Sequence, residues 1–139
     1  MSVRRNAASC VRSVGVCSSG KRKACRSGFV AAVPSGNQDA YRAHAVKAAA
    51  LFREYGATQC IECWGDDVPE GKVTSFPMAV QRKDDETVVF SWVRWPSRAV
   101  RDAAWKKMMD DPRMQPEANP MPFDGKRLIY GGFAPIVEA

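Results

Sequence analysis

The run TVVFSWVRW, residues 87–95, is apolar on both faces of the strand that it predicts. Side chains alternate between the two faces of a strand. One face would carry Val88, Phe90 and Trp92, and the other Val89, Val93 and Trp95. Burial of apolar surface contributes on the order of 25 cal/mol per Å², so a sheet that contains this strand needs a covering layer on each side. The run 127–137, RLIYGGFAPIV, is also apolar on both faces.

The order of the remaining predicted elements defines a fold class. Apolar runs between turn residues predict strands, and an Ala-rich stretch with helical periodicity predicts a helix. In chain order we expect a strand at 28–33, a helix at 38–55, strands at 58–64, 73–81 and 87–95, a helix at 98–110 and a strand at 127–137. The segments 73–81 and 87–95 are predicted to pair as a hairpin. This order gives two split βαβ units, the ferredoxin-like α+β pattern.

The second face of such a sheet requires a partner. Two helices cover only one face, so the other apolar face stays open in a single chain. A homodimer that packs sheet on sheet closes it. We therefore expect a homodimer with a large, apolar interface.

The positive charge of the chain lies in its first 27 residues. They hold seven of the 21 Lys and Arg residues and none of the 15 acids, which leaves 14 basic residues against 15 acids in the domain 28–139. With few large apolar residues, the segment 1–27 is predicted to be a disordered extension, either without a role or resembling a transit peptide. The chain has neither a secretory h-region nor a run of about 20 apolar residues, so we expect no membrane partner.

The fragment CIECWGDDVPEGK, residues 60–72, resembles several chemical motifs without matching any of them. Cys60 and Cys63 lie three apart in a predicted strand and therefore face opposite sides, unlike the cysteines of a zinc knuckle. In a phosphate loop, four residues separate two glycines, and a Ser or Thr follows the lysine. Here five residues separate Gly65 from Gly71, and a valine follows Lys72. We expect inert buried cysteines, no metal and no cofactor. Without a disulfide framework, a cytoplasmic location is expected.

Glu62 is the candidate acid or base of the domain. A carboxylate in mid-strand either faces solvent or occupies a pocket, where burial raises its pKa toward acid–base use. Its predicted neighbours in a cleft between sheet and helices are Asp66, Asp67, Lys72, Ser91, Arg127 and Tyr130. Lys72 or Arg127 would hold an anionic group, and Tyr130 would orient the ligand. The structural alternatives to these roles are a solvated turn formed by Asp66 and Asp67 and an ion pair formed by Arg127.

Three functional hypotheses follow from the sequence, and none of them decides whether the protein is an enzyme. The first is a protein that binds or transforms a small organic molecule in that cleft. The second is a non-catalytic dimeric module whose polar residues specify turns and the interface. The third, which the near-neutral domain disfavours, is association with nucleic acid through the basic extension.

The runs ECWGDDVPEGKVTSFPMAV, ETVVFSW and MPFDGKRLIYGGF resemble the YbaA-like family, a conserved domain of unknown function in the dimeric α/β-barrel superfamily. The resemblance extends from residue 28 to about residue 137. It implies a ferredoxin-like protomer that pairs sheet to sheet. It supplies no established reaction, because the wider superfamily includes cofactor-free monooxygenases, small lyases and haem-handling proteins, and a shared fold does not determine function.

Overall fold

The computed structural model describes residues 23–139, which form one antiparallel sheet and three α-helices. The strands are β1 (Cys25–Pro34), β2 (Gln59–Trp64), β3 (Glu86–Trp95) and β4 (Ile129–Phe133). The α-helices are α1 (Gln38–Glu54), α2 (Phe76–Ala79) and α3 (Arg98–Asp110), and short 3-10 helices occur at Ser35–Asn37, Pro112–Met114 and Gly125–Arg127. The predicted α+β class is confirmed.

The strands lie in the order β2-β3-β1-β4, and each neighbouring pair is antiparallel. Apart from α2, which takes the place of the strand predicted at 73–81, the elements follow the predicted order and give βαββαβ. The two central strands, β1 and β3, pair along ten residues each, from Cys25 opposite Trp95 to Pro34 opposite Glu86. The strands β2 and β4 therefore form the two edges.

The prediction of an extended strand at 73–81 is wrong, and so is the hairpin that depends on it. This part of the chain contains α2. Ser75 caps the helix, because its hydroxyl accepts a hydrogen bond of 3.1 Å from the backbone N–H of Met78. Pro77 fits the first turn of a helix, because the N–H groups there make no hydrogen bond within the helix and the N–H that proline lacks is not needed. The strand that pairs with β3 on this side is β2.

Two predicted strand ends also differ from the structure. The first strand begins at Cys25 instead of residue 28, and Cys25 is buried in the core. This overturns the predicted disorder of 25–27, whereas the prediction for 1–22 lies outside the described residues. The last strand ends at Phe133 instead of residue 137, since Pro135 lacks the N–H needed to continue the ladder. Ile136 and Val137 are consequently exposed.

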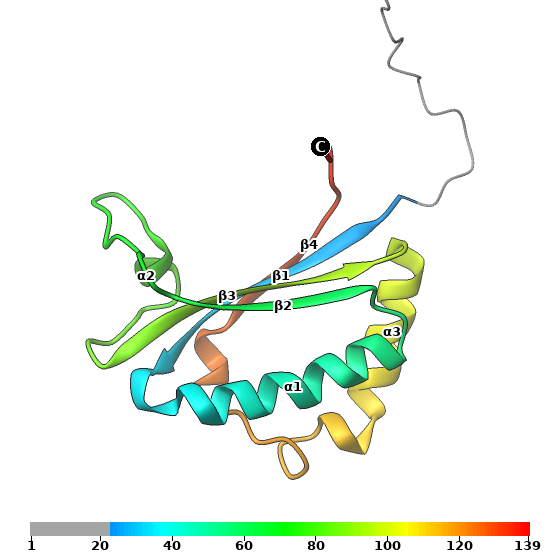
Figure 1. The fold of residues 1–139 in the computed structure, drawn as a ribbon, viewed down its shortest axis with the longest axis horizontal. Coiled ribbons are helices and arrows are strands. Elements are labelled where there is room, and N and C mark those ends of the chain that lie inside the picture. The colour runs from blue at the N-terminus through cyan, green and yellow to red at the C-terminus, as the bar shows by residue number, and fades with distance from the viewer. Residues whose placement is uncertain (1–22) are drawn as a thin grey trace, which may run out of the picture.

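Both long helices pack on the same face of the sheet (Figure 1). The core beneath them is centred on Trp95, whose side chain is fully buried and meets Phe52 of α1 edge to face at 6.2 Å. Met108 of α3 completes this contact region. The indole N–H of Trp95 donates to the Ser27 hydroxyl at 3.1 Å, so its polar atom is satisfied.

The opposite face of the sheet is only partly covered by the described chain. At one end, Val80 beyond α2 packs on Val30 and Val88. Elsewhere Phe90, Ile129 and Phe133 remain 43%, 43% and 60% exposed. We call this surface the open face. In residues 23–139, no helix is long and apolar enough to cross a membrane.

Candidate functional site

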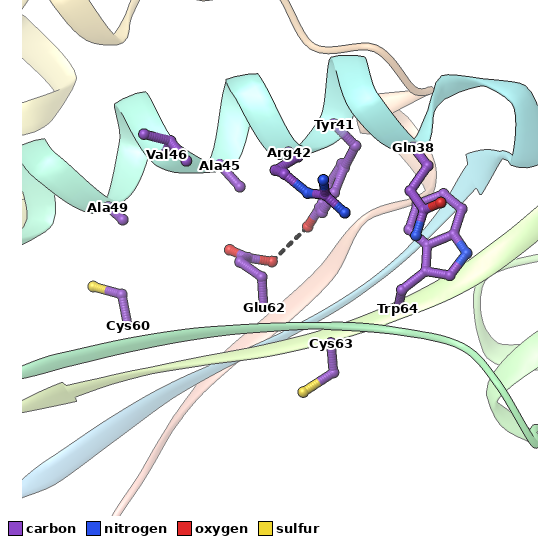
Figure 2. Close-up of a pocket in the computed structure, with 10 residues that line it drawn as sticks. All are labelled: Gln38, Tyr41, Arg42, Ala45, Val46, Ala49, Cys60, Glu62, Cys63 and Trp64. Atoms are coloured by element: carbon purple, nitrogen blue, oxygen red, sulfur yellow. Dashed lines mark hydrogen bonds between the residues drawn. The ribbon is translucent and has the colours of Figure 1, made fainter.

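A pocket of about 280 Å³ lies between α1 and the edge strand β2, on the face of the sheet that the long helices cover (Figure 2). Its apolar walls are Ala45, Val46 and Ala49 of α1 with Cys60 and Trp64 of β2. Its polar groups come from Gln38, Tyr41, Arg42 and Glu62. A mostly apolar hollow with a few convergent polar groups is typical of a small-molecule site.

The local sequence explains why the hollow exists. Alternation along β2 directs Glu62 and Trp64 toward α1 and Cys63 to the other side of the sheet (Figure 2). On α1, Ala45 and Ala49 lie one turn apart and face this strand. Their small side chains leave room that leucines at the same positions would fill. The pocket thus depends on two alanines opposite a carboxylate.

Glu62 and Tyr41 form the polar centre of the pocket. The Tyr41 hydroxyl donates a hydrogen bond of 2.6 Å to Oε2 of Glu62 (Figure 2). The pocket side of Glu62 is open to solvent, but the surrounding atoms remove part of its hydration, and this burial raises the pKa of its carboxyl. Hydrogen bonding by Tyr41 and Ser91 opposes the rise with smaller effects. Burial and the adjacent carboxylate both raise the pKa of Tyr41.

An aromatic cluster holds Tyr41 in place. Its ring lies 6.1 Å from Trp64, 5.8 Å from Phe123 and 6.3 Å from His44, measured between centroids. The Nδ1 atom of His44 lies 3.0 Å from Oδ1 of Asn119, and burial lowers the pKa of the imidazole. His44 thus ties α1 to the segment that follows α3. The cluster fixes the direction of the tyrosine hydroxyl.

The two cysteines of β2 point to opposite faces of the sheet, as the sequence predicts (Figure 2). Burial raises the pKa of the half-buried Cys60 thiol, which disfavours the reactive thiolate. Cys63 is exposed instead of buried, because it lies on the open face. Within the described part of the chain, no three His, Cys, Asp or Glu side chains gather in a way that could hold a metal ion.

The structure places Arg127 in an ion pair away from the pocket. Its guanidinium donates to both carboxylate oxygens of Glu86 at 2.6 and 2.7 Å, and to Asp124 at 3.0 Å. It also donates to the carbonyl oxygen of Gln81 at 2.9 Å. The Arg127 side chain is 13% exposed and that of Glu86 4%. Arg127 therefore has the structural role that was its alternative, and its predicted contact with the Glu62 cluster is not formed.

The other predicted site residues are only partly brought together. Ser91 is buried and lies directly opposite Glu62 in the strand register. Tyr130 lies on β4 with β1 and β3 between it and β2; it is 75% exposed and its ring stacks on Phe29. Three further candidates are exposed in the loop after β2 and do not line the pocket: Asp66, Asp67 and Lys72.

Sequence reasoning missed the α1 side of the site. It predicted a helix at 38–55 but gave no site role to Gln38, Tyr41 or Arg42. One signal was available, because a buried tyrosine hydroxyl needs a hydrogen-bonding partner. The carboxylate of Glu62, in the middle of the strand that follows the helix, is that partner.

Comparison with known proteins identifies a protein family and bacterial relatives. Residues 26–125 match the profile of a family described as "Protein of unknown function (DUF1428)". The chain is 60% identical over 111 residues to the uncharacterized protein YbaA of Escherichia coli strain K12, an alignment that covers 80% of this chain and 95% of that protein. The same values hold for the uncharacterized protein YbaA of Shigella flexneri.

Proposed function

The chain belongs to the DUF1428 family, and from the geometry of the α1–β2 pocket we propose that it binds a small organic molecule through the carboxyl group of Glu62. One observation carries the proposal: a carboxyl with a raised pKa lies in a largely apolar hollow and is oriented by a 2.6 Å hydrogen bond from Tyr41. Perturbed titratable groups in clefts are a common mark of functional sites.

The pocket favours a ligand of limited size with two different ends. Its volume of about 280 Å³ is just below the range of roughly 300–1,000 Å³ found for sites of drug-sized ligands. Glu62 can accept a hydrogen bond from the ligand. The Arg42 guanidinium, 71% exposed and only weakly paired with Asp39 at 3.9 Å, is available for an anionic group of the same ligand. A single-ring carboxylate that carries a hydrogen-bond donor has this pattern.

Glu62 is also the group suited to proton transfer. A carboxyl with a raised pKa exchanges a proton closer to neutral pH than an exposed one does. In a ligand whose hydroxyl or amine donates to Glu62, the carboxylate accepts that proton and Tyr41 holds the carboxylate in position. This assigns acid–base chemistry to Glu62. Tyr130, which was predicted to orient the ligand, lies elsewhere on the sheet.

A binding experiment tests the proposal with three probes: 4-hydroxybenzoate has both ends, benzoate lacks the donor and phenol lacks the carboxylate. The indole N–H signal of Trp64, in the pocket wall, reports binding by NMR. We expect 4-hydroxybenzoate to bind most tightly, and Glu62→Gln and Arg42→Gln each to weaken it about tenfold. Glu117→Gln, at an exposed position, is the control. Equal binding by wild type and Glu62→Gln, or no saturable shift with any probe, contradicts the proposal.

We further propose that two copies of the chain pack open face on open face, giving a ferredoxin-like dimeric α/β barrel. Support comes from the exposed apolar side chains of that face, Phe90, Ile129 and Phe133, and from the two long helices, α1 and α3, which cover only the other side (Figure 1). The residues after β4 leave on the open-face side, where Ile136 and Val137 are 95% and 80% exposed. A second copy supplies an equally apolar, self-complementary surface.

A purely structural dimeric module is the alternative function. In this alternative, the protomer binds a second protomer and no small molecule. The α1–β2 pocket weighs against it, because the pocket lies on the helix-covered face and dimerisation through the open face leaves it unfilled. The binding experiment above separates the two functions, since a structural module binds none of the probes.

A further inference from the structure

A second cavity, of about 410 Å³, lies at the end of the sheet where β1 begins and β4 ends. It is bordered by Lys23, which precedes β1, and by Arg98 and Arg101 in the first turn of α3. The remaining walls are small or apolar and come from Ala24 and Cys25, where β1 begins, and from residues 132–134 at the end of β4. Three cations from two distant parts of the chain therefore converge on one hollow.

The charges around this cavity do not cancel. Asp102 accepts from Nε and Nη2 of Arg101 at 3.1 and 3.0 Å, and it lies 3.5 Å from Arg98. This single carboxylate offsets one of the three positive charges. Burial raises the pKa of Cys25, so its thiol brings no negative charge to the cavity wall. The excess of two positive charges matches a dianion.

Packing and the space at Gly132 fix the position of the Arg101 side chain. Its side chain is only 14% exposed, so its guanidinium is held more tightly than a surface arginine. A β-carbon at position 132 would overlap the guanidinium, with Nη1 as the nearest atom. Gly132 therefore leaves space for the arginine head group beside the cavity. Asp102 engages Nε and Nη2, which leaves Nη1 on the side toward Gly132 and the cavity.

We propose that this cavity binds the phosphate group of a small molecule, held by Arg98, Arg101 and Lys23. Guanidinium groups bind phosphate through charge-assisted hydrogen bonds, and Lys adds a third positive charge. The site is separate from the Glu62 pocket, which has a different set of lining residues on α1 and β2. It does not depend on the function proposed for that pocket.

Calorimetric titration of the full-length protein with inorganic phosphate, at constant ionic strength in chloride, tests the site. We expect saturable binding by the wild type. Arg98→Gln and Lys23→Gln should each weaken it about tenfold, the effect of one charge-assisted hydrogen bond. Arg98 is 81% exposed, so its replacement leaves folding intact. Lys106→Gln removes one charge from an exposed position of α3 outside the cavity and should bind as the wild type does.

Two further measurements make the test specific. Gly132→Ala should weaken phosphate binding by displacing the Arg101 guanidinium, while Glu62→Gln should leave it unchanged. Tighter binding of phenyl phosphate than of inorganic phosphate assigns the site to an organophosphate, and equal binding assigns it to free phosphate; both results support the site. Absence of saturable binding by the wild type, or equal loss of affinity in Arg98→Gln and Lys106→Gln, overturns the proposal.

Discussion

Replacing Phe90 with aspartate tests dimerisation through the open face. Phe90 lies near the centre of that face, in contact with Phe76 and Trp92, with 43% of its surface exposed. Full burial of a Phe side chain contributes about 1.5–3 kcal/mol. Covering the exposed 43% in both copies therefore contributes roughly 1–3 kcal/mol per dimer. Its loss weakens dimerisation about five- to hundredfold, and two buried, unpaired aspartates weaken it further.

Sedimentation equilibrium over a range of protein concentrations measures this effect. We expect the wild type to be a dimer at micromolar concentration and Phe90→Asp to be a folded monomer with unchanged circular dichroism. The control is Met109→Asp, because Met109 is 74% exposed on α3, in the helical layer. A monomeric wild type, or equal dissociation of Met109→Asp and Phe90→Asp, would show that the protein does not dimerise through the open face.

Three further predictions concern the pocket and the stability of the fold. Ala49→Leu should fill the pocket and abolish binding of 4-hydroxybenzoate with little change in stability, since leucine is nearly as good a helix former as alanine; NMR titration and thermal unfolding measure the two effects. Tyr41→Phe should raise the pKa of Glu62 further, because it removes a hydrogen bond that lowers it; a carbon-13 carboxyl titration detects the change. Arg127→Met should destabilise the protein more than Arg127→Met combined with Glu86→Leu, because the single change leaves a buried carboxylate unpaired.

The ion pair between Arg127 and Glu86 also predicts a pH dependence of stability. Hydrogen bonding from Arg127 lowers the pKa of Glu86 below its ordinary value of 4.5. The folded state therefore binds the proton less readily than the unfolded state, so the pair stabilises the protein above that value and the contribution is lost as the pH falls through the lowered folded pKa. Denaturant unfolding between neutral and acidic pH should show this loss in the wild type and not in Arg127→Met.

Local patterns in the sequence were sufficient for most of the sheet. The apolar run 87–95 predicted β3, and the Ala-rich run 38–55 gave α1 nearly to its ends. The segment 73–81 was mistaken for a strand because its apolar residues fit an extended pattern. Ser75 and Pro77 also fit the start of a helix, and the structure shows that this local capping chemistry prevails.

The candidate site was harder to predict, because it depends on contacts between distant residues. Glu62 could be singled out from its position in mid-strand, and Ser91 follows it in the register. Arg127 and Tyr130 were grouped with them only because all four residues are polar on strands. The order of the strands separates Tyr130 from Glu62, and Glu86 binds Arg127. Nothing in the local sequence around these residues reports either fact.

The proposed function depends on Glu62 as a ligand-binding carboxyl with a raised pKa. A carbon-13 NMR titration of the Glu62 carboxyl, recorded with and without 4-hydroxybenzoate, tests it most directly. We predict that Glu62 has a pKa above the ordinary value of 4.5 in the free protein and that its signal changes saturably on binding, with Glu117 unaffected. A Glu62 pKa at or below the ordinary value, together with a signal that does not respond to the probe, would contradict it.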